Sequence, residues 1–270
     1  MSAIVEHVRL SDSRLVGLIE GTRSGNTLLW RTVVAMAMGS ILMFALQFVD
    51  ARLINGVNIW DKPAKFFLSL AVQYGTVSWA LSLLPLAERA SRWVRWPVVL
   101  MLIAGWGEMA YMIFRASRGE ASHFNTSSFG AALGYSLMGV GAVTLTATAA
   151  IIGWIVWRRR EGSIWKEAAG LGLMVGSLLG TIAGAYMSAQ TSHLVGGVAS
   201  DAGGLAFFNW SVTGGDLRVA HFVGLHAAQF IPLAAMSGDR RVVYGVAIAM
   251  ALFTTVIFMM GASGVPLFKV

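Results

Sequence analysis

Long apolar stretches recur along the whole chain and are separated by short polar connections. A helix needs about 20 mostly apolar residues to cross the hydrocarbon core of a bilayer. This rule predicts seven spanning segments, at about residues 30–50, 64–86, 97–116, 129–157, 167–190, 217–236 and 242–262. The pattern therefore predicts an all-α, polytopic transmembrane helix bundle of about seven spans. A cytoplasmic N-terminal segment (residues 1–28) would precede a single transmembrane domain (residues 29–270).

The composition agrees with this interpretation. Hydrophobic residues make up 56% of the 270 residues and charged residues only 12%, whereas a soluble domain carries about a quarter charged residues. The net charge of +7 would suggest nucleic-acid binding in a soluble protein. Here the Lys and Arg residues lie in the connections, so the predicted partner is the lipid bilayer and no nucleic acid. The chain has no cysteine, which excludes disulfides, thiolate ligands and cysteine nucleophiles.

The basic residues are divided unequally between the two ends of the predicted helices. The N-terminal segment and the second, fourth and sixth connections together hold 13 of the 20 Lys and Arg residues. Short connections rich in Lys and Arg stay in the cytoplasm, so we expect a cytoplasmic N-terminus and an extracytoplasmic C-terminus. The connections on the other side are longer and mix polar with aromatic residues, so we expect a functional site to open outward.

Four of the five histidines lie on the outer side or in its half of the predicted membrane: His123, His193, His221 and His226. One interpretation is that they are interfacial side chains bonded to loop backbone. His226 lies roughly 13 Å into its helix at 1.5 Å per residue, and an ionisable group at that depth is a functional candidate. Gln229 shares its face and is expected to orient it. His221 points about 140° away from His226, so the two cannot hold one ion as neighbours on one face.

Glu108 is the second deep ionisable residue, near the middle of the third predicted helix. Arg115 lies on the same face, so a structural ion pair is one interpretation. The alternative is a buried carboxylate that faces His226 and shares a proton with it, which suits a proton relay or a metal site.

Two further patterns have structural and functional interpretations. Four glycines at four-residue spacing mark the fifth predicted helix: Gly172, Gly176, Gly180 and Gly184. Such a stripe predicts close helix packing, and a flat groove for a lipid tail or planar cofactor is the alternative. Lys62 and Lys65 begin the second predicted helix, where they would be interfacial anchors or would bind an anionic headgroup or substrate; Asp50 and Arg52 are possible partners.

The blocks "WDKPAKF", "RGEASHFN" and "GDLRVAHFVGLHAAQ" resemble those of an uncharacterised group of bacterial polytopic membrane proteins. This resemblance covers the second to sixth predicted helices. It implies a multi-pass protein of the bacterial inner membrane and supplies no mechanism. The last predicted helix has no lysine for a retinal Schiff base. The second and seventh helices lack the zinc-binding histidines of the seven-helix ceramidase and adiponectin-receptor hydrolases.

The preferred hypothesis is a redox or hydrolytic centre in the outer half of the membrane that uses haem or a divalent metal such as zinc, copper or iron. We predict catalytic roles for Glu108, His226 and Asp216. Cofactor contacts are predicted for His221, His226, Gln229, Arg218 and Arg115, and metal ligation for His123, His193, His221 and His226. The substrate would be a lipid or small molecule from the extracytoplasmic side. The alternatives are a proton-coupled transporter or channel that uses His226 and Glu108, and a non-catalytic lipid-binding or assembly factor.

Overall fold

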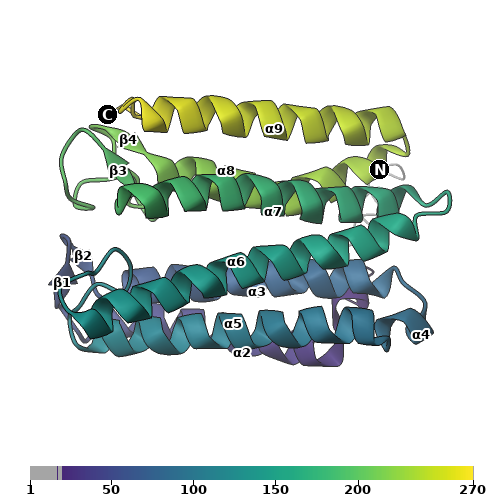
Figure 1. The fold of residues 1–270 in the computed structure, drawn as a ribbon, viewed down its shortest axis with the longest axis horizontal. Helices are drawn as coiled ribbons and strands as arrows, with labels where there is room; N and C mark the ends of the chain where they lie inside the picture. Colours follow the sequence, from purple (N-terminus) through teal and green to yellow (C-terminus); the bar gives the residue numbers. More distant parts are fainter. Residues whose placement is uncertain (1–16, 18–19, 270) are drawn as a thin grey trace, which may run out of the picture.

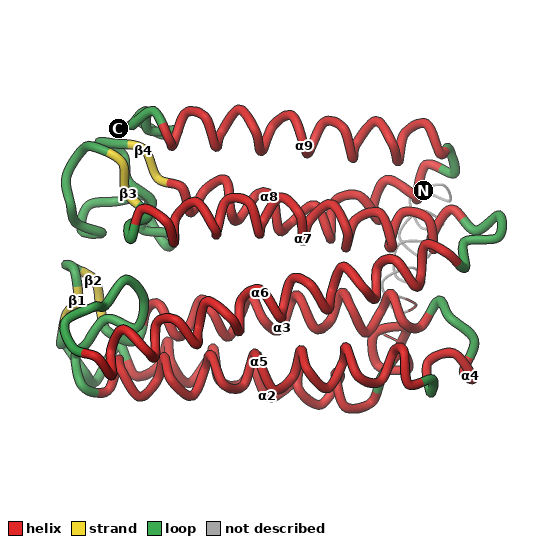
Figure 2. Tube along the Cα trace, viewed as in Figure 1, coloured by secondary structure: helices red, strands yellow, loops and turns green. Residues whose placement is uncertain are grey.

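A computed structural model describes residue 17 and residues 20–269, and nearly all of its regular structure is helical (Figures 1 and 2). The long helices in this part of the chain are α2 (Thr27–Leu46), α3 (Asp61–Ser82), α5 (Arg92–Ser117), α6 (Phe129–Arg158), α7 (Ile164–Gln190), α8 (Leu217–Ala234) and α9 (Arg240–Ala262). Shorter pieces are α4 (Leu86–Arg89) and the 3-10 turn η1 (Ala235–Ser237). Two small antiparallel ribbons pair β1 (Leu53–Ile54) with β2 (Val57–Asn58) and β3 (Leu194–Val195) with β4 (Gly215–Asp216).

Six helices are long and apolar enough to cross a membrane, namely α2, α5, α6, α7, α8 (continued by η1) and α9. The chain is therefore a multi-pass membrane protein with an all-α bundle. The remaining predicted segment corresponds to α3, which is 22 residues long. It is less apolar than these six helices and is not among the candidate spans. It begins with charged residues, and neighbouring helices bury much of its length, so it has less need of an apolar surface. Most of the predicted segment 1–28 lies outside the described residues.

The helices form two layers (Figure 1). One layer holds α7, α8 and α9, and the other holds α2, α3, α5 and α6. Consecutive helices pack against each other, as they do in α2–α3, α5–α6 and α8–α9. In Figure 1, α6 runs obliquely from the side of α5 at one end to the side of α7 at the other. The two layers are thus joined mainly through the contact of α6 with α7.

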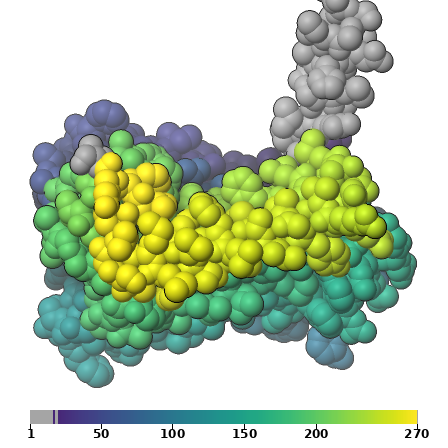
Figure 3. Space-filling view, turned by 90° about the horizontal axis from the view of Figure 1, so that it is seen from above, coloured from purple at the N-terminus to yellow at the C-terminus, as the bar shows by residue number. Residues whose placement is uncertain are grey.

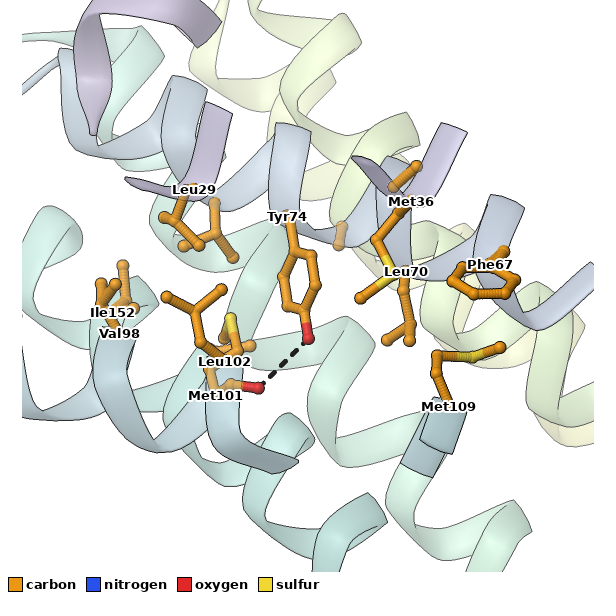
Figure 4. Close-up of a cluster of buried hydrophobic side chains, with 14 of the residues drawn as sticks. Leu29, Met36, Phe67, Leu70, Tyr74, Val98, Met101, Leu102, Met109 and Ile152 are labelled. Atoms are coloured by element: carbon orange, nitrogen blue, oxygen red, sulfur yellow. Dashed lines mark hydrogen bonds between the residues drawn. The ribbon is translucent and has the colours of Figure 1, made fainter. Parts of the chain in front are cut away.

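A buried apolar cluster fills the layer that contains α2, α3 and α5 (Figure 4). Leu29 and Met36 of α2 meet Tyr74 of α3 and Met101 of α5, all fully buried. The Tyr74 hydroxyl donates a hydrogen bond to the Met101 carbonyl oxygen at 3.1 Å. This bond satisfies a polar group that would be costly to bury alone.

The glycines of α7 allow its backbone to approach α8, which confirms the predicted close packing. A Cβ atom at Gly176 would lie 2.9 Å from the Leu225 carbonyl oxygen and 3.0 Å from the Ala228 nitrogen. A Cβ atom at Gly184 would lie 3.3 Å from the His221 ring. The stripe therefore serves helix contact and also leaves space for an imidazole at its C-terminal end.

The longer connections gather at one end of the bundle, which we call the loop end (Figures 1 and 2). The segment 191–216 folds down onto the helices here, as its aromatic residues predict. Trp210 stacks on Phe208 with ring centres 4.2 Å apart and lies against Phe222 of α8. Figure 3 shows α9 (yellow) along one face of the molecule, with the purple and blue N-terminal helices on one side of it and teal segments on the other.

Candidate functional site

Charged side chains at the loop end form a network that we call the clamp, made of His193, Asp201, Asp216 and Arg218. Arg218 Nη1 lies 2.8 Å from Asp201 Oδ1, and Arg218 Nη2 lies 2.7 Å from Asp216 Oδ2. His193 Nε2 is 3.1 Å from the same Asp201 oxygen. Burial alone would raise the pKa of Asp201, but its hydrogen bond with His193 and the charge of Arg218 hold that pKa well below its usual range.

Asp216 has a structural position in the clamp. It is the N-cap residue of α8, and its carboxylate accepts hydrogen bonds from the backbone nitrogens of Arg218 at 3.0 Å and Ser211 at 2.9 Å. A carboxylate at a helix N-terminus satisfies otherwise free N–H groups and complements the helix dipole. Since Asp216 makes these backbone bonds and an ion pair with the Arg218 side chain, its geometry fits helix capping and charge pairing better than the predicted catalytic role.

The clamp extends to the other helix layer through two amide side chains. Asn55 Nδ2, in the β1–β2 turn, donates to Asp201 Oδ2 at 2.6 Å. Asn209 Nδ2 donates to Asp61 Oδ2 at 2.7 Å, and the backbone carbonyl oxygen of Asn209 accepts from Arg218 Nη2 at 2.7 Å. The segment 191–216 therefore ties the start of α8 to the start of α3.

Lys62 lies beside the clamp at the start of α3. Unlike Lys65, whose ammonium group is 2.6 Å from Asp61, Lys62 makes no hydrogen bond or ion pair with any described residue. Its ammonium group lies 5.7 Å from the centre of the Phe66 ring. Lys62 is close enough to Arg218, Asp201 and Glu108 for the charges to interact. This side chain is therefore a cation that lacks a close counter-ion.

Glu108 supplies the matching negative group from the middle of α5. It is only 6% exposed, and its Oε1 atom is buried without a hydrogen-bond partner in the described part of the chain. A side chain at Gly141 of α6 would overlap the Glu108 carboxylate. One turn further along α5, the Tyr111 hydroxyl is also buried without a partner. The contact of α5 with α6 thus holds two polar atoms that no described residue satisfies.

Arg115 does not pair with Glu108. Its Nη1 atom lies 2.7 Å from Glu120 Oε2, in the connection that follows α5. The charge that interacts with Glu108 is that of Lys62, which comes from a different helix.

His123 lies near Lys62, and His221 lies near His123. His123 Nδ1 is 3.0 Å from Ser122 Oγ, and its ring is 5.7 Å from that of Phe66. Burial lowers the pKa of His123 well below its usual value, and the charges of Lys62 and His221 act in the same direction. His221 Nδ1 is 2.8 Å from the Gly180 carbonyl oxygen. Because a carbonyl oxygen only accepts, this nitrogen carries the proton and Nε2 of a neutral His221 keeps its lone pair.

His226 belongs to a different environment. Its Nδ1 atom lies 2.9 Å from Gln229 Oε1, and Gln229 Nε2 donates to Thr76 Oγ1 of α3 at 2.8 Å. The expectation that Gln229 orients His226 is confirmed. The alternative prediction that Glu108 faces His226 is wrong, however, because Glu108 interacts with Lys62 and is packed against α6.

The structure does not support the prediction of a shared metal site. Among the described residues, no three His, Cys, Asp or Glu side chains are placed to hold a metal ion. The physical reason is that each predicted histidine ligand is bonded to a different partner: His123 to Ser122, His193 to Asp201, His221 to Gly180 and His226 to Gln229. His221 and His226 are five residues apart on α8, and this spacing already directs them to different sides of the helix.

The sequence analysis identified Glu108 and the histidines as candidate site residues. It did not include Lys62 among them and did not distinguish Lys62 from Lys65. Lysine at a helix start is common as an interfacial anchor, and nothing in the local sequence distinguishes Lys62 from Lys65. One signal was present: Asp61 lies four residues before Lys65, which is the spacing of a helix ion pair, and leaves Lys62 without such a partner. No comparable pattern in the sequence indicates that Asp201 pairs with Arg218 and His193.

A surface hollow of about 340 Å³ opens at the loop end beside the clamp. Its lining includes Asn55, Phe124, His193 and the glycine-rich backbone at residues 196 and 197. Phe124 follows His123 directly, and its ring is 6.1 Å from that of His193. The hollow therefore adjoins both the clamp and the segment that carries His123.

Comparison of the chain with protein-family models, with curated proteins and with solved structures finds no match. The arrangement of Lys62, Glu108 and the clamp is thus the basis for a functional assignment.

Proposed function

We propose that this protein is a membrane transporter that binds a small anion together with a proton, with Lys62 and Glu108 as the central groups. The observation that carries this proposal is the pair of opposite charges inside the bundle. The Glu108 Oε1 atom is buried without a hydrogen-bond partner among the described residues, and its charge interacts with that of Lys62, which is half-buried at the start of α3.

Charge balance in a medium of low dielectric constant gives the coupling. An isolated buried charge is costly, so the Lys62 ammonium group needs one negative neighbour. An ionised Glu108 supplies it when the site holds no ligand. A bound anion supplies it in the other state, and a second negative charge on Glu108 would then be unbalanced. Glu108 therefore takes up a proton as the anion binds, with about one proton per anion.

The surrounding groups suit this role. Tyr111, one turn from Glu108, offers a hydroxyl for a bound anion or for the protonated carboxyl group. The clamp lies over Lys62 at the loop end, and Arg218 and Asp201 both interact with the Lys62 charge. We infer that the anion enters from the hollow beside His193 and Phe124, and that opening of the clamp admits it. Intramembrane ionisable residues with named partners are typical of such pathways.

The topology completes the proposal. We place the N-terminus in the cytoplasm and the loop end outside, since most Lys and Arg residues lie at the opposite end. In this arrangement α3 is the seventh span, and the membrane is the inner membrane of a bacterium. One alternative from the sequence analysis is a proton-coupled transporter or channel that uses His226 and Glu108. The present proposal keeps Glu108 and has Lys62 in place of His226. The redox and hydrolytic hypothesis has less support because the histidines do not converge.

Proton uptake on anion binding tests the proposal. Purified protein in weakly buffered detergent solution would be mixed with a monovalent anion (chloride, nitrate or acetate) while a pH indicator records protons and calorimetry records binding. We expect at least one of these anions to bind with about one proton. Glu108→Gln should still bind the anion without proton uptake, and Lys62→Met should not bind it. Lys166→Met, at the other end of the bundle, is the control and should behave as the unmodified protein. Binding that is unchanged in Lys62→Met would refute the proposal.

A further inference from the structure

A hydrogen-bond chain links α3 to α8 away from the proposed anion site. Thr76 Oγ1 donates to the Val72 carbonyl oxygen at 2.8 Å, and Gln229 Nε2 donates to Thr76 Oγ1 at 2.8 Å. The Gln229 Oε1 atom then lies 2.9 Å from His226 Nδ1. The chain thus runs from a backbone carbonyl of α3 to an imidazole of α8.

The direction of these bonds fixes the proton on the imidazole. A carbonyl oxygen only accepts, so the Thr76 hydroxyl must use its hydrogen for Val72. The Thr76 oxygen therefore accepts, and the amide nitrogen of Gln229 must face it. The amide oxygen is left to face His226, where Nδ1 has to be the donor. In the neutral imidazole, Nε2 is then unprotonated and is an acceptor.

This acceptor is unpaired, and the His226 side chain is only partly covered by its described neighbours. His226 Nε2 makes no hydrogen bond in the described part of the chain, and it is not among the enclosed polar atoms without partners. Phe230 and Leu233, four and seven residues further along α8, share its face and are 54% and 50% exposed. The ring of Phe222, on the preceding turn, packs against His226 at 4.2 Å between centres.

The depth of His226 makes this exposure significant. It is near the middle of the candidate span Leu217–Ser237, which is 21 residues long, so it lies about 13 Å from one end and about 16 Å from the other at 1.5 Å per residue. No water is available at that depth to satisfy a lone pair. The hydroxyl group of a molecule dissolved in the hydrocarbon layer has a hydrogen to donate and finds no acceptor there.

We propose that His226 is the polar contact of a second site, open to the lipid, that binds an apolar molecule through its hydroxyl group. Nε2 accepts the hydrogen bond, and Phe222 and Phe230 contact the apolar body. The occupant is a neutral molecule dissolved in the bilayer, such as a phenol, a quinol or an isoprenoid alcohol. An anionic headgroup does not fit, because its oxygens carry lone pairs that an unprotonated nitrogen cannot satisfy. This site is independent of the anion site at Lys62 and Glu108.

Nitrogen NMR of the protein in lipid nanodiscs, with ¹⁵N-labelled histidine, tests both steps. The probe is an alkylphenol with an apolar tail, and the matched control ligand is its methyl ether, which has no hydrogen to donate. His226 should show a protonated Nδ1 and an unprotonated Nε2 without ligand. The phenol should shift the Nε2 signal, and the ether should leave it unchanged. A proton on Nε2, or equal shifts with both ligands, would overturn the proposal.

Variants of the protein distinguish binding of the phenol at this site from its nonspecific partition into the lipid. We expect His226→Phe to remove the specific binding. Gln229→Leu should weaken the binding about fivefold, which corresponds to roughly 1 kcal/mol for a hydrogen bond that is no longer oriented. Phe114→Leu, at an exposed position of α5 outside this site, is the control and should bind as the unmodified protein does. Competition by a benzoquinol, an isoprenoid alcohol or a diacylglycerol then distinguishes the natural sources. Equal phenol binding by His226→Phe would also overturn the proposal.

Discussion

Arg218 Nη1 lies 2.8 Å from Asp201 Oδ1, and this ion pair fastens the segment 191–216 to the first turn of α8. Asp201 also accepts a hydrogen bond from Asn55, which belongs to the connection between α2 and α3. The two helix layers are therefore joined at the loop end by charged and amide groups, in addition to the packing of α6 against α7.

Removal of the Arg218 charge should destabilise this end of the molecule. Arg218→Met leaves Asp201 and Asp216 without their cation, and their side chains are only 12% and 1% exposed. Loss of one partner from such a pair costs roughly 2–4 kcal/mol. Unfolding in mixed detergent and SDS micelles measures the change. Arg52→Met is the control, because the Arg52 side chain is 52% exposed in its pair with Asp50, and exposed ion pairs contribute little to stability. Equal losses in both variants would contradict the clamp.

Acid should weaken the clamp through Asp201. The pKa of this carboxyl lies below its usual value of 3.8 in the folded protein, so the unfolded chain binds more protons at low pH. The stabilisation from Asp201 is therefore complete above about pH 4 and is lost as the pH falls through the folded-state pKa. Thermal unfolding midpoints between neutral pH and about pH 3 measure this effect. Asp201→Asn should be less stable at neutral pH and should depend less on acid. An identical acid profile in both proteins would exclude Asp201 as the cause.

The contact of α7 with α8 should not tolerate a methyl group at its closest point. In Gly176→Ala the new Cβ would meet the α8 backbone at 2.9 Å and 3.0 Å, so the helices must separate at a cost of about 1–3 kcal/mol. Gly245→Ala is the matched control, because it lies on α9 with no atom within 4 Å of the new Cβ. Unfolding in mixed micelles compares the two variants. A stable Gly176→Ala protein would mean that the helices are not held this closely.

The orientation of the bundle is open to a simple labelling test, because the chain has no cysteine of its own. Ala199→Cys places a thiol at the loop end, and Glu161→Cys places one in the connection between α6 and α7 at the other end. We expect a membrane-impermeant maleimide to label Ala199→Cys in intact cells and Glu161→Cys only after permeabilisation. The reverse result would invert the proposed topology.

The hydropathy pattern predicted the helices well because burial in lipid demands uninterrupted apolar stretches. The glycine stripe predicted the approach of α7 to α8, because small residues have few other roles at that spacing. The local pair of His226 and Gln229 was also predictable from their spacing on one face of a helix.

The candidate site was less predictable, because its groups come from separate helices. Lys62 and Glu108 are 46 positions apart, and no local pattern indicates that α3 brings the first near the second. His226 was expected to face Glu108 on the basis of depth alone. Depth along a helix does not determine direction around it, and the structure directs His226 to Gln229, which bonds to Thr76 of α3.

Infrared difference spectroscopy of anion binding tests the central claim most directly. The spectrum would be recorded with and without the anion that binds in the proton-uptake assay. If Lys62 and Glu108 act as proposed, the anion induces a carbonyl stretching band of a protonated carboxylic acid, and this band is absent in Glu108→Gln and in Lys62→Met. A spectrum without that band in the unmodified protein, or one that keeps it in Glu108→Gln, would contradict the account.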